Sequence, residues 1–348
     1  MRQQAAGSSK SLESVMRMRV SNTVIGLAVV LAYGMAAAQD KPLKKIIWGQ
    51  TSISSSQWIP WIAKDAKLYE KNGLDVDIVY LRGGSGDTSK AMIAGSIFAA
   101  PVTTATLMTA NLSGADLTTI AHTTKAVQSK IISRPDLKRP EDIKGKRIAS
   151  SGLGSLGDFL HRVVIKRYGI NPERDVTWLS IGAPPDRLQA LENKLVDAAD
   201  LSHPFDIRAE KKGFKTLWDA RTEVPYPSMS VVTRRKTIQD DRDTVMRMIR
   251  SHVEGIHFLK TQKEASQKIL AKYLKTNDKE IIDGSYEIYK EDFIAVPYPI
   301  TQGLQTTYEY VAQRRPEIYN HKAEEFTDPS FIAELEKSGF IKKLYGAK

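Results

Sequence analysis

Strand-like and helix-like segments alternate along the first third of this chain. Residues 44–50 read as a strand, an amphipathic helix follows through Tyr69, and residues 74–81 alternate apolar and polar side chains as a second strand. A glycine-rich turn and a short helix then lead to a third, very short strand at residues 97–99. Strands that are separated by helices pair in parallel, because each connection crosses over the sheet. We therefore predict an α/β unit with a parallel sheet.

The same alternation recurs in the middle of the chain, and the sequence then becomes helical. The second set of predicted strands and helices is, in order, residues 146–150, 157–168, 176–181, 186–195, 198–201, 205–212 and 215–218. A strand at residues 229–233 precedes predicted helices at residues 240–260, 264–274, 278–289, 300–315 and 330–338. Two α/β units of similar order indicate two lobes, each with a parallel sheet flanked by helices, and a helical C-terminal part.

The N-terminal segment has the parts of a secretion signal. Two arginines precede an apolar run at residues 23–31, and three alanines follow at residues 36–38, as a signal peptidase requires. The apolar run is shorter than the roughly 20 residues that span a bilayer. No cysteine follows it, so we expect no lipid anchor. We predict a signal peptide at residues 1–38, starting at Met1 or Met16, and a soluble periplasmic protein; an N-terminal membrane anchor is the alternative.

The chain contains no cysteine among its 348 residues, which excludes several kinds of chemistry. Disulfides, thiolate nucleophiles and Cys-ligated metals are impossible, so stability must come from packed cores. The formal net charge is +11, and the predicted signal carries four basic residues and one acidic residue, which leaves +8 (11 − 3). A basic exported protein meets anionic solutes or membrane head groups rather than nucleic acid.

Three polar loops each follow a predicted strand and open a predicted helix. They are residues 54–57 (SSSQ), 83–86 (GGSG) and 150–155 (SSGLGS). Helix N-termini offer unpaired N–H groups and a partial positive charge, so they can hold anions. Ligands of open α/β sheets also collect at the carboxyl ends of strands. The alternative is that the serines only cap their own helices. Three such loops together favour a ligand-binding cleft.

Motifs of catalysis are weak in this sequence. Residues 152–157 match the G-x-G-x-x-G pattern of dinucleotide sites, but the next strand ends at residues 181–184 (IGAP) without the acidic residue that would hold a ribose. Neither a Gly-x-Ser-x-Gly elbow nor an HExxH pair is present. Only His203, just past a strand end, lies where a catalytic histidine could act. We expect no catalytic residue, no metal and no cofactor.

Residues 63–76 (AKDAKLYEKNGLDV) resemble a signature of the periplasmic solute-binding proteins of nitrate-, sulfonate- and taurine-type ABC importers. This group shares its fold with pyrimidine-precursor-binding proteins. Further segments that fit it are residues 83–86, 91–95, 142–149, 191–199, 328–331 and 339–340. The resemblance implies a two-lobed, type II-like periplasmic binding protein with one ligand between the lobes. The implied division is residues 44–125 plus 230–348 for lobe one, residues 126–229 for lobe two, and hinges near 124–128 and 228–232.

The resemblance implies a non-catalytic, monomeric receptor that captures a small anionic organic solute and delivers it to an ABC permease, without nucleic acid. A cysteine-independent, hydrolase-like enzyme on the same fold and a sensory partner of a membrane protein are the alternatives. We see no arginine in the ligand loop of lobe two, so hydroxyls and backbone N–H groups should hold the anion, and Trp58 could form a wall of the cleft. The predicted ligand-binding residues are Ser55, Ser56, Trp58, Gly84, Ser85, Thr103, Thr104, Gly154, Ser155, Ser202 and His203.

Overall fold

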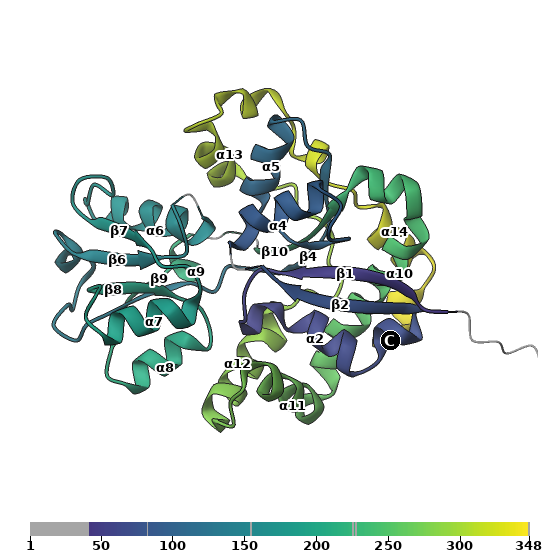
Figure 1. Ribbon diagram of the computed structural model, residues 1–348, viewed down its shortest axis with the longest axis horizontal. Helices are drawn as coiled ribbons and strands as arrows, with labels where there is room; N and C mark the ends of the chain where they lie inside the picture. The colour runs from purple at the N-terminus through teal and green to yellow at the C-terminus, as the bar shows by residue number, and fades with distance from the viewer. Residues whose placement is uncertain (1–41, 82, 154, 225, 227, 347–348) are drawn as a thin grey trace, which may run out of the picture. The chain divides into compact units, whose positions relative to one another are not determined.

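The computed structural model describes residues 42–348 apart from residues 82, 154, 225, 227 and 347–348. The predicted signal peptide therefore lies outside the described residues. Leu43–Lys348 forms one compact unit, whose elements are drawn in Figure 1. Within the described part of the chain, none of the helices combines the length and the apolar character that crossing a membrane requires.

Strands from the first and last parts of the unit form two small sheets, and a β-bridge connects these sheets. The β1 and β2 strands pair in parallel, whereas β10 pairs antiparallel with both β3 and β4. A bridge between Trp48 and Ala99 connects β1 to the start of β3, which gives the order β2-β1-β3-β10-β4. The strands are β1 (Lys44–Gln50), β2 (Leu74–Tyr80), β3 (Ala100–Pro101), β4 (Leu117–Thr124) and β10 (Ser228–Arg234).

The middle of the chain forms a five-stranded sheet with the equivalent order, β7-β6-β8-β5-β9. The β6 strand is parallel to β7 and β8, and β5 runs antiparallel to β8 and β9. One face of this sheet is covered by α6 (Leu156–Arg167) and the other by α7 (Pro184–Glu192) and α8 (Phe205–Lys211) (Figure 1). The strands are β5 (Lys130–Ser133), β6 (Arg147–Ser150), β7 (Thr177–Ser180), β8 (Ala198–Leu201) and β9 (Lys215–Asp219).

The sheets are mixed, so the predicted parallel pairing holds for some strand pairs and is wrong for others. Strands joined through helices do pair in parallel, as predicted, but β5 and β10 enter their sheets in the opposite direction. The β4 strand was not predicted, because every one of its positions is buried and its sequence, LTTIAHTT, has no period of two. The third strand lies at Ala100–Pro101 rather than at residues 97–99. An unpredicted helix, α5 (Thr104–Leu112), follows it.

Each of two predicted helices is interrupted at one residue. The helix expected from Trp58 to Tyr69 is two helices, α2 (Trp58–Asp65) and α3 (Leu68–Lys71), because Lys67 has the left-handed φ of 56°. In α10 (Arg235–Thr261), Asp241 has non-helical dihedral angles, so a kink at this residue separates a short helical segment from the long one. The other helices are α4 (Gly84–Ile93), α9 (Ala220–Glu223), α11 (Lys263–Leu274), α12 (Lys279–Asp292), α13 (Gln305–Ala312), α14 (Ser330–Lys337) and α15 (Phe340–Tyr345).

The chain passes twice between the two sheets. The first passage joins the end of β4 to the start of β5, and the second joins α9 to β10. The hinge predicted near residues 124–128 coincides with the first passage, whereas residues 228–232 lie inside β10. The division into two lobes at these passages stays a prediction.

Candidate functional site

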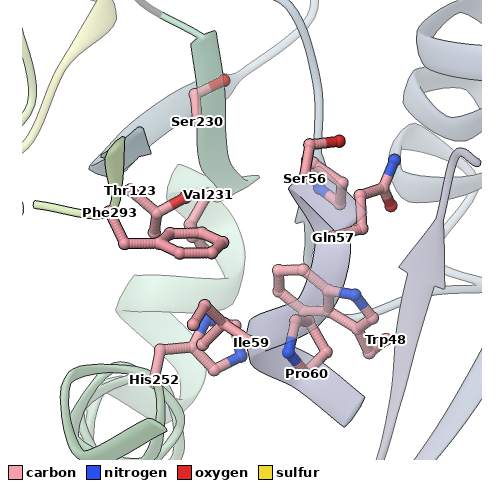
Figure 2. Close-up of a pocket in the computed structure, with 11 residues that line it drawn as sticks. Trp48, Ser56, Gln57, Ile59, Pro60, Thr123, Ser230, Val231, His252 and Phe293 are labelled. Carbon is pink, nitrogen blue, oxygen red and sulfur yellow. The ribbon is translucent and has the colours of Figure 1, made fainter. Parts of the chain in front are cut away.

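The carboxyl ends of strands from both sheets open onto one cavity of about 350 Å³, which we call the cleft. This volume lies in the range of small-molecule sites. A second cavity, between Trp48, His252 and Phe293, has only about 20 Å³, which is room for one water molecule (Figure 2). The cleft is therefore the candidate functional site.

On the side of the first sheet, the cleft is lined by the beginnings of α4 and α5. Gly84 and Ser85 of the predicted polar loop line it, and so does Thr103, another predicted binder. The Ser85 hydroxyl accepts a hydrogen bond from the Thr103 backbone N–H at 3.2 Å, which ties the two helix starts together. Thr103 also caps α5 by accepting from the Thr106 N–H. The two helices thus present their N-terminal ends to the cleft.

A chain of hydroxyl groups continues this wall through the loop after β1. Ser56 lines the cleft as predicted, and its Oγ lies 2.8 Å from Ser54 Oγ, which in turn lies 2.9 Å from Ser52 Oγ. The Gln57 side-chain amide donates to Ser52 Oγ at 2.7 Å and to Thr51 Oγ1 at 2.5 Å. These bonds fix the positions of the hydroxyls along the wall.

On the side of the five-stranded sheet, Ser155 and Ser202 line the cleft as predicted. Ser155 caps α6 by accepting from the Asp158 N–H at 3.3 Å, and its Oγ also accepts from the Ser151 hydroxyl at 2.7 Å. Ser155 therefore caps its own helix and also lines the cleft.

Arg187 lines the cleft, although no arginine was predicted in the ligand loop on this side. It lies in the first turn of α7, beyond the loop itself, and its side chain is only 5% exposed. Its Nε donates to the backbone carbonyl of Asp200 at 2.5 Å, and its Nη1 donates to the Gly182 carbonyl. Asp200 is also buried, and its Oδ2 lies 3.6 Å from Arg187 Nη2. Arg187 and Asp200 are the charged side chains among the described residues that line the cleft.

A series of hydrogen bonds connects Trp218 to Asp200. Trp218 Nε1 donates to His161 Nδ1 at 3.0 Å, so the imidazole hydrogen is on Nε2, which lies 2.9 Å from Ser129 Oγ. The Ser129 hydroxyl donates to Asp200 Oδ1 at 2.5 Å. Burial would raise the pKa of Asp200, but the charge of Arg187 and the hydrogen bonds from His161 and Ser129 outweigh it and hold that pKa well below its usual range.

This arrangement contains a serine, a histidine and an aspartate, but it is not arranged as a catalytic triad. In a triad, the histidine nitrogen facing the serine accepts the serine proton, and the aspartate holds the other nitrogen. Here the nitrogen of His161 that faces Ser129 already carries the hydrogen, because Trp218 donates to the other one. The geometry does not favour nucleophilic catalysis by Ser129.

The other predicted binders do not line the cleft or lie outside the described residues. Gly154 belongs to the undescribed residues. Trp58 is fully buried in a core cluster with residues of α10, α11 and α12, instead of forming a wall. His203 is also buried, with its Nδ1 2.9 Å from Asp206 Oδ1, and it does not line the cleft. The remaining two are Ser55, whose Oγ donates to Ser285, and Thr104, which is buried.

Gly157 is required by the close approach of Asp200 to α6. A Cβ at this position would lie 2.4 Å from Asp200 Oδ2, and contacts with Ser129, His161 and Arg187 hold this carboxylate in place. We expect Gly157→Ala to destabilise the protein by about 1–3 kcal/mol, as other overpacking substitutions do. Urea unfolding would measure this, with Gly152→Ala as the control, because a Cβ on Gly152 meets nothing within 4 Å. Equal stability of the two variants would contradict the packing argument.

Comparisons with known proteins agree on the fold. The family model described as NMT1/THI5 like matches residues 59–266. The periplasmic aliphatic sulphonate binding protein SsuA from Escherichia coli has a TM-score of 0.64 and 17% identity, with 81% of this chain and 98% of that one covered. The periplasmic nitrate-binding protein NrtA from Synechocystis PCC 6803 has a TM-score of 0.70 and 14% identity, covering 88% and 92%. The desulfurization enzyme DSZB has a TM-score of 0.61 and 13% identity, covering 85% and 99%.

These findings confirm the predicted family resemblance and the predicted fold class. The chain has the α/β fold of periplasmic binding proteins. A search of the curated proteins found no match. Within the described residues, no group of three or more histidine, aspartate or glutamate side chains is placed to hold a metal ion.

Proposed function

The chain belongs to the NMT1/THI5-like family, and from that premise we propose that it is an exported receptor for a small organic solute with an anionic group. It would bind the solute in the cleft, as a monomer in the periplasm, and deliver it to an ABC importer in the membrane. The observation that carries this proposal is the cleft itself, which is lined by hydroxyls and helix N-termini from both sheets.

The wall on the side of the first sheet suits an anion. Its described lining residues carry no charged side chain, and they include Ser85, Gly86 and Thr103 at the starts of α4 and α5. Backbone N–H groups at helix starts have no partner within the helix, and the helix dipole adds a partial positive charge there. An anionic group can therefore be held on this wall without a dedicated lysine or arginine.

The expected affinity is within reach of such a wall. A micromolar dissociation constant corresponds to about −8 kcal/mol. Hydrogen bonds to a charged group contribute roughly 1.5–3 kcal/mol each. A few of them exceed this value before the cost of ordering the solute and the loops is subtracted. The hydroxyls are already hydrogen-bonded to one another through Ser52, Ser54 and Ser56, which keeps that cost low.

Thermal unfolding with a panel of solutes tests the receptor function. Sulfonates, carboxylates, nitrate and heterocyclic acids would each be added to the purified protein at increasing concentration. A solute at 100 times its dissociation constant stabilises the folded state by about 2.7 kcal/mol, which raises the melting temperature by a few degrees. We expect a saturable rise for one class of anionic solute, with the solute recovered unchanged. Turnover of the solute would instead favour the enzyme alternative.

A further inference from the structure

Helices α8 and α12 pack into different hydrophobic cores. Phe205 and Ala209 of α8 belong to a cluster with residues of α7 and of the strands β5, β6 and β8. Tyr286 and Tyr289 of α12 belong to a cluster with Trp58 and with residues of α10 and α11. The two helices are therefore fixed to opposite sides of the cleft, and a direct contact between them joins these sides.

Lys211, the last residue of α8, connects the two helices by ion pairs. Its Nζ lies 2.9 and 2.8 Å from the two carboxylate oxygens of Asp278 and 2.8 Å from Glu280 Oε2. Asp278 also caps α12, because its Oδ1 accepts from the backbone N–H groups of Glu280 and Ile281. A single ammonium group thus holds two carboxylates at the start of α12.

Halfway along α12, a glycine permits the close approach of α8. A Cβ at Gly284 would lie 3.2 Å from Ile207 Cδ1, which is closer than side chains normally pack. A larger residue at this position would therefore push the two helices apart. Glycine destabilises the middle of a helix. Its presence here fits a position that serves the contact with α8 rather than the stability of α12 itself.

The other end of this contact reaches the cleft. The Ser55 backbone N–H donates to the His203 carbonyl at 3.4 Å, across the two sides. The next residue after Ser55 and the residue before His203 are Ser56 and Ser202, and both line the cleft. We call the whole contact, from Lys211 to His203, the α8–α12 contact. Separation of the two helices would therefore draw the opposite walls of the cleft apart.

Building on the proposed receptor function, we propose that Lys211 determines solute affinity from outside the cleft. Its ion pairs stabilise the arrangement in which Ser56 and Ser202 both line one cavity. The apparent dissociation constant of a solute rises as the fraction of molecules in the binding-competent arrangement falls. Lys211 is a positioning residue in this sense, because it acts on the solute only through the walls that the α8–α12 contact holds together.

The distance between two spin labels tests the contact without any solute. The chain has no cysteine, so cysteines introduced at Leu195, which follows α7, and Lys268 of α11 can be labelled selectively, and both positions are exposed. We expect Lys211→Glu to lengthen the label distance, because like charges then face each other. Lys211→Arg keeps the ion pairs and should keep the wild-type distance. Gly284→Leu should lengthen the distance by steric means, with the charges unchanged.

Lys212→Glu is the matched control, because it makes the same charge change at the neighbouring residue. Lys212 Nζ lies 2.6 Å from Glu192 Oε1, and Glu192 belongs to α7 on the same side of the cleft. The label distance of this variant should therefore equal that of the wild type. Wild-type distances in both Lys211→Glu and Gly284→Leu would overturn the inference, and so would an equal lengthening in Lys212→Glu.

Isothermal titration calorimetry with ethanesulfonate, nitrate and propanoate as probes measures the consequence for affinity. We expect Lys211→Glu to weaken the binding of a probe about tenfold, which corresponds to about 1.4 kcal/mol, and Lys212→Glu to stay within about twofold of the wild type. Equal affinities of Lys211→Glu and the wild type would overturn the affinity role of Lys211 and leave the receptor function standing. Binding of no probe by the wild type would overturn the receptor for these anions and the affinity role with it, whereas the label distances report on the contact independently.

Discussion

Replacing Arg187 with leucine is expected to destabilise the protein by about 3–5 kcal/mol, the range found when one partner of a buried ion pair is removed. Arg187 and Asp200 have side chains that are only 5% and 6% exposed. Without the guanidinium, Asp200 stays buried next to Gly157 as an uncompensated charge. The carbonyls of Asp200 and Gly182 also lose their donors. The ion pair and the backbone contacts are thus lost in one substitution.

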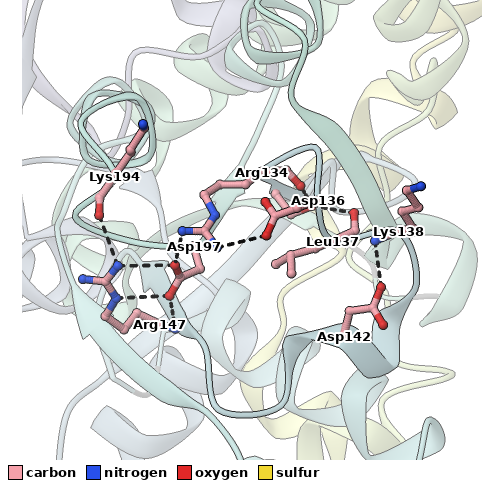
Figure 3. Close-up of polar contacts among 9 residues, drawn as sticks. Arg134, Asp136, Leu137, Lys138, Asp142, Arg147, Lys194 and Asp197 are labelled. Atoms are coloured by element: carbon pink, nitrogen blue, oxygen red, sulfur yellow. Dashed lines mark hydrogen bonds and ion pairs between the residues drawn. The ribbon is translucent and has the colours of Figure 1, made fainter.

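Arg147→Leu is the matched control for this variant in urea unfolding. Arg147 also pairs with a buried aspartate, Asp197, but that carboxylate keeps a second cation, because Arg134 Nη1 lies 2.9 Å from its Oδ1 (Figure 3). Arg147 is also 44% exposed, so water compensates part of what is lost. We expect a cost of about 1 kcal/mol, near the upper end for exposed pairs. Similar losses in the two variants would contradict the role given to Arg187.

The pH dependence of the Arg187→Leu effect follows from the sign of the Asp200 shift. In the wild type, Arg187 and the hydrogen bonds hold the pKa of Asp200 below its unfolded value of about 3.9. Ionised Asp200 therefore contributes stability above about pH 4, and this contribution is lost as the pH falls through the folded pKa. Removing Arg187 raises the folded pKa. The difference in stability between the variant and the wild type should then be largest near neutral pH and shrink below about pH 4.

The positions of several cleft residues could be predicted because they depend on local rules. A serine or glycine that follows a strand and opens a helix must lie at the carboxyl edge of the sheet. Ser56, Ser85 and Ser155 were found in this way. The same reasoning could not find Arg187, because a charged residue inside a helix normally faces solvent. Its burial is decided by the carbonyls of Gly182 and Asp200, which are brought to it by two different strand ends.

The strand directions could be predicted only where a helix separates the strands. A helix between β6 and β7 makes them parallel, and the sequence pattern contains that information. The antiparallel entry of β10 depends on where the chain returns from the five-stranded sheet, about a hundred residues after its partner β4. No local pattern near Val231 or His122 indicates this pairing. The resemblance implied that the chain returns near residue 230, but the direction in which β10 then pairs is set by contacts between distant segments.

Trp58 is the residue at which the sequence prediction and the structure differ most clearly. As a wall of the cleft, it should affect solute affinity; as a core residue, it should affect stability. Its side chain is fully buried, and its ring meets Tyr286 edge to face with centroids 6.4 Å apart. We expect Trp58→Ala to cost about 3–5 kcal/mol, as for other large aromatic residues truncated in cores. The dissociation constant of the solute, measured on the folded fraction, should stay within about twofold of the wild type.

Trp58→Phe separates the loss of packing from the loss of the indole. The Trp58 Nε1 group is buried without a hydrogen-bond partner in the described part of the chain, so its removal forfeits no hydrogen bond. We therefore expect Trp58→Phe to cost less than about 1.5 kcal/mol, with affinity again unchanged. Chemical unfolding and calorimetry on both variants give the two quantities separately. A large loss of affinity in the stable phenylalanine variant would return Trp58 to the cleft, because only direct contact with the solute would make the indole necessary.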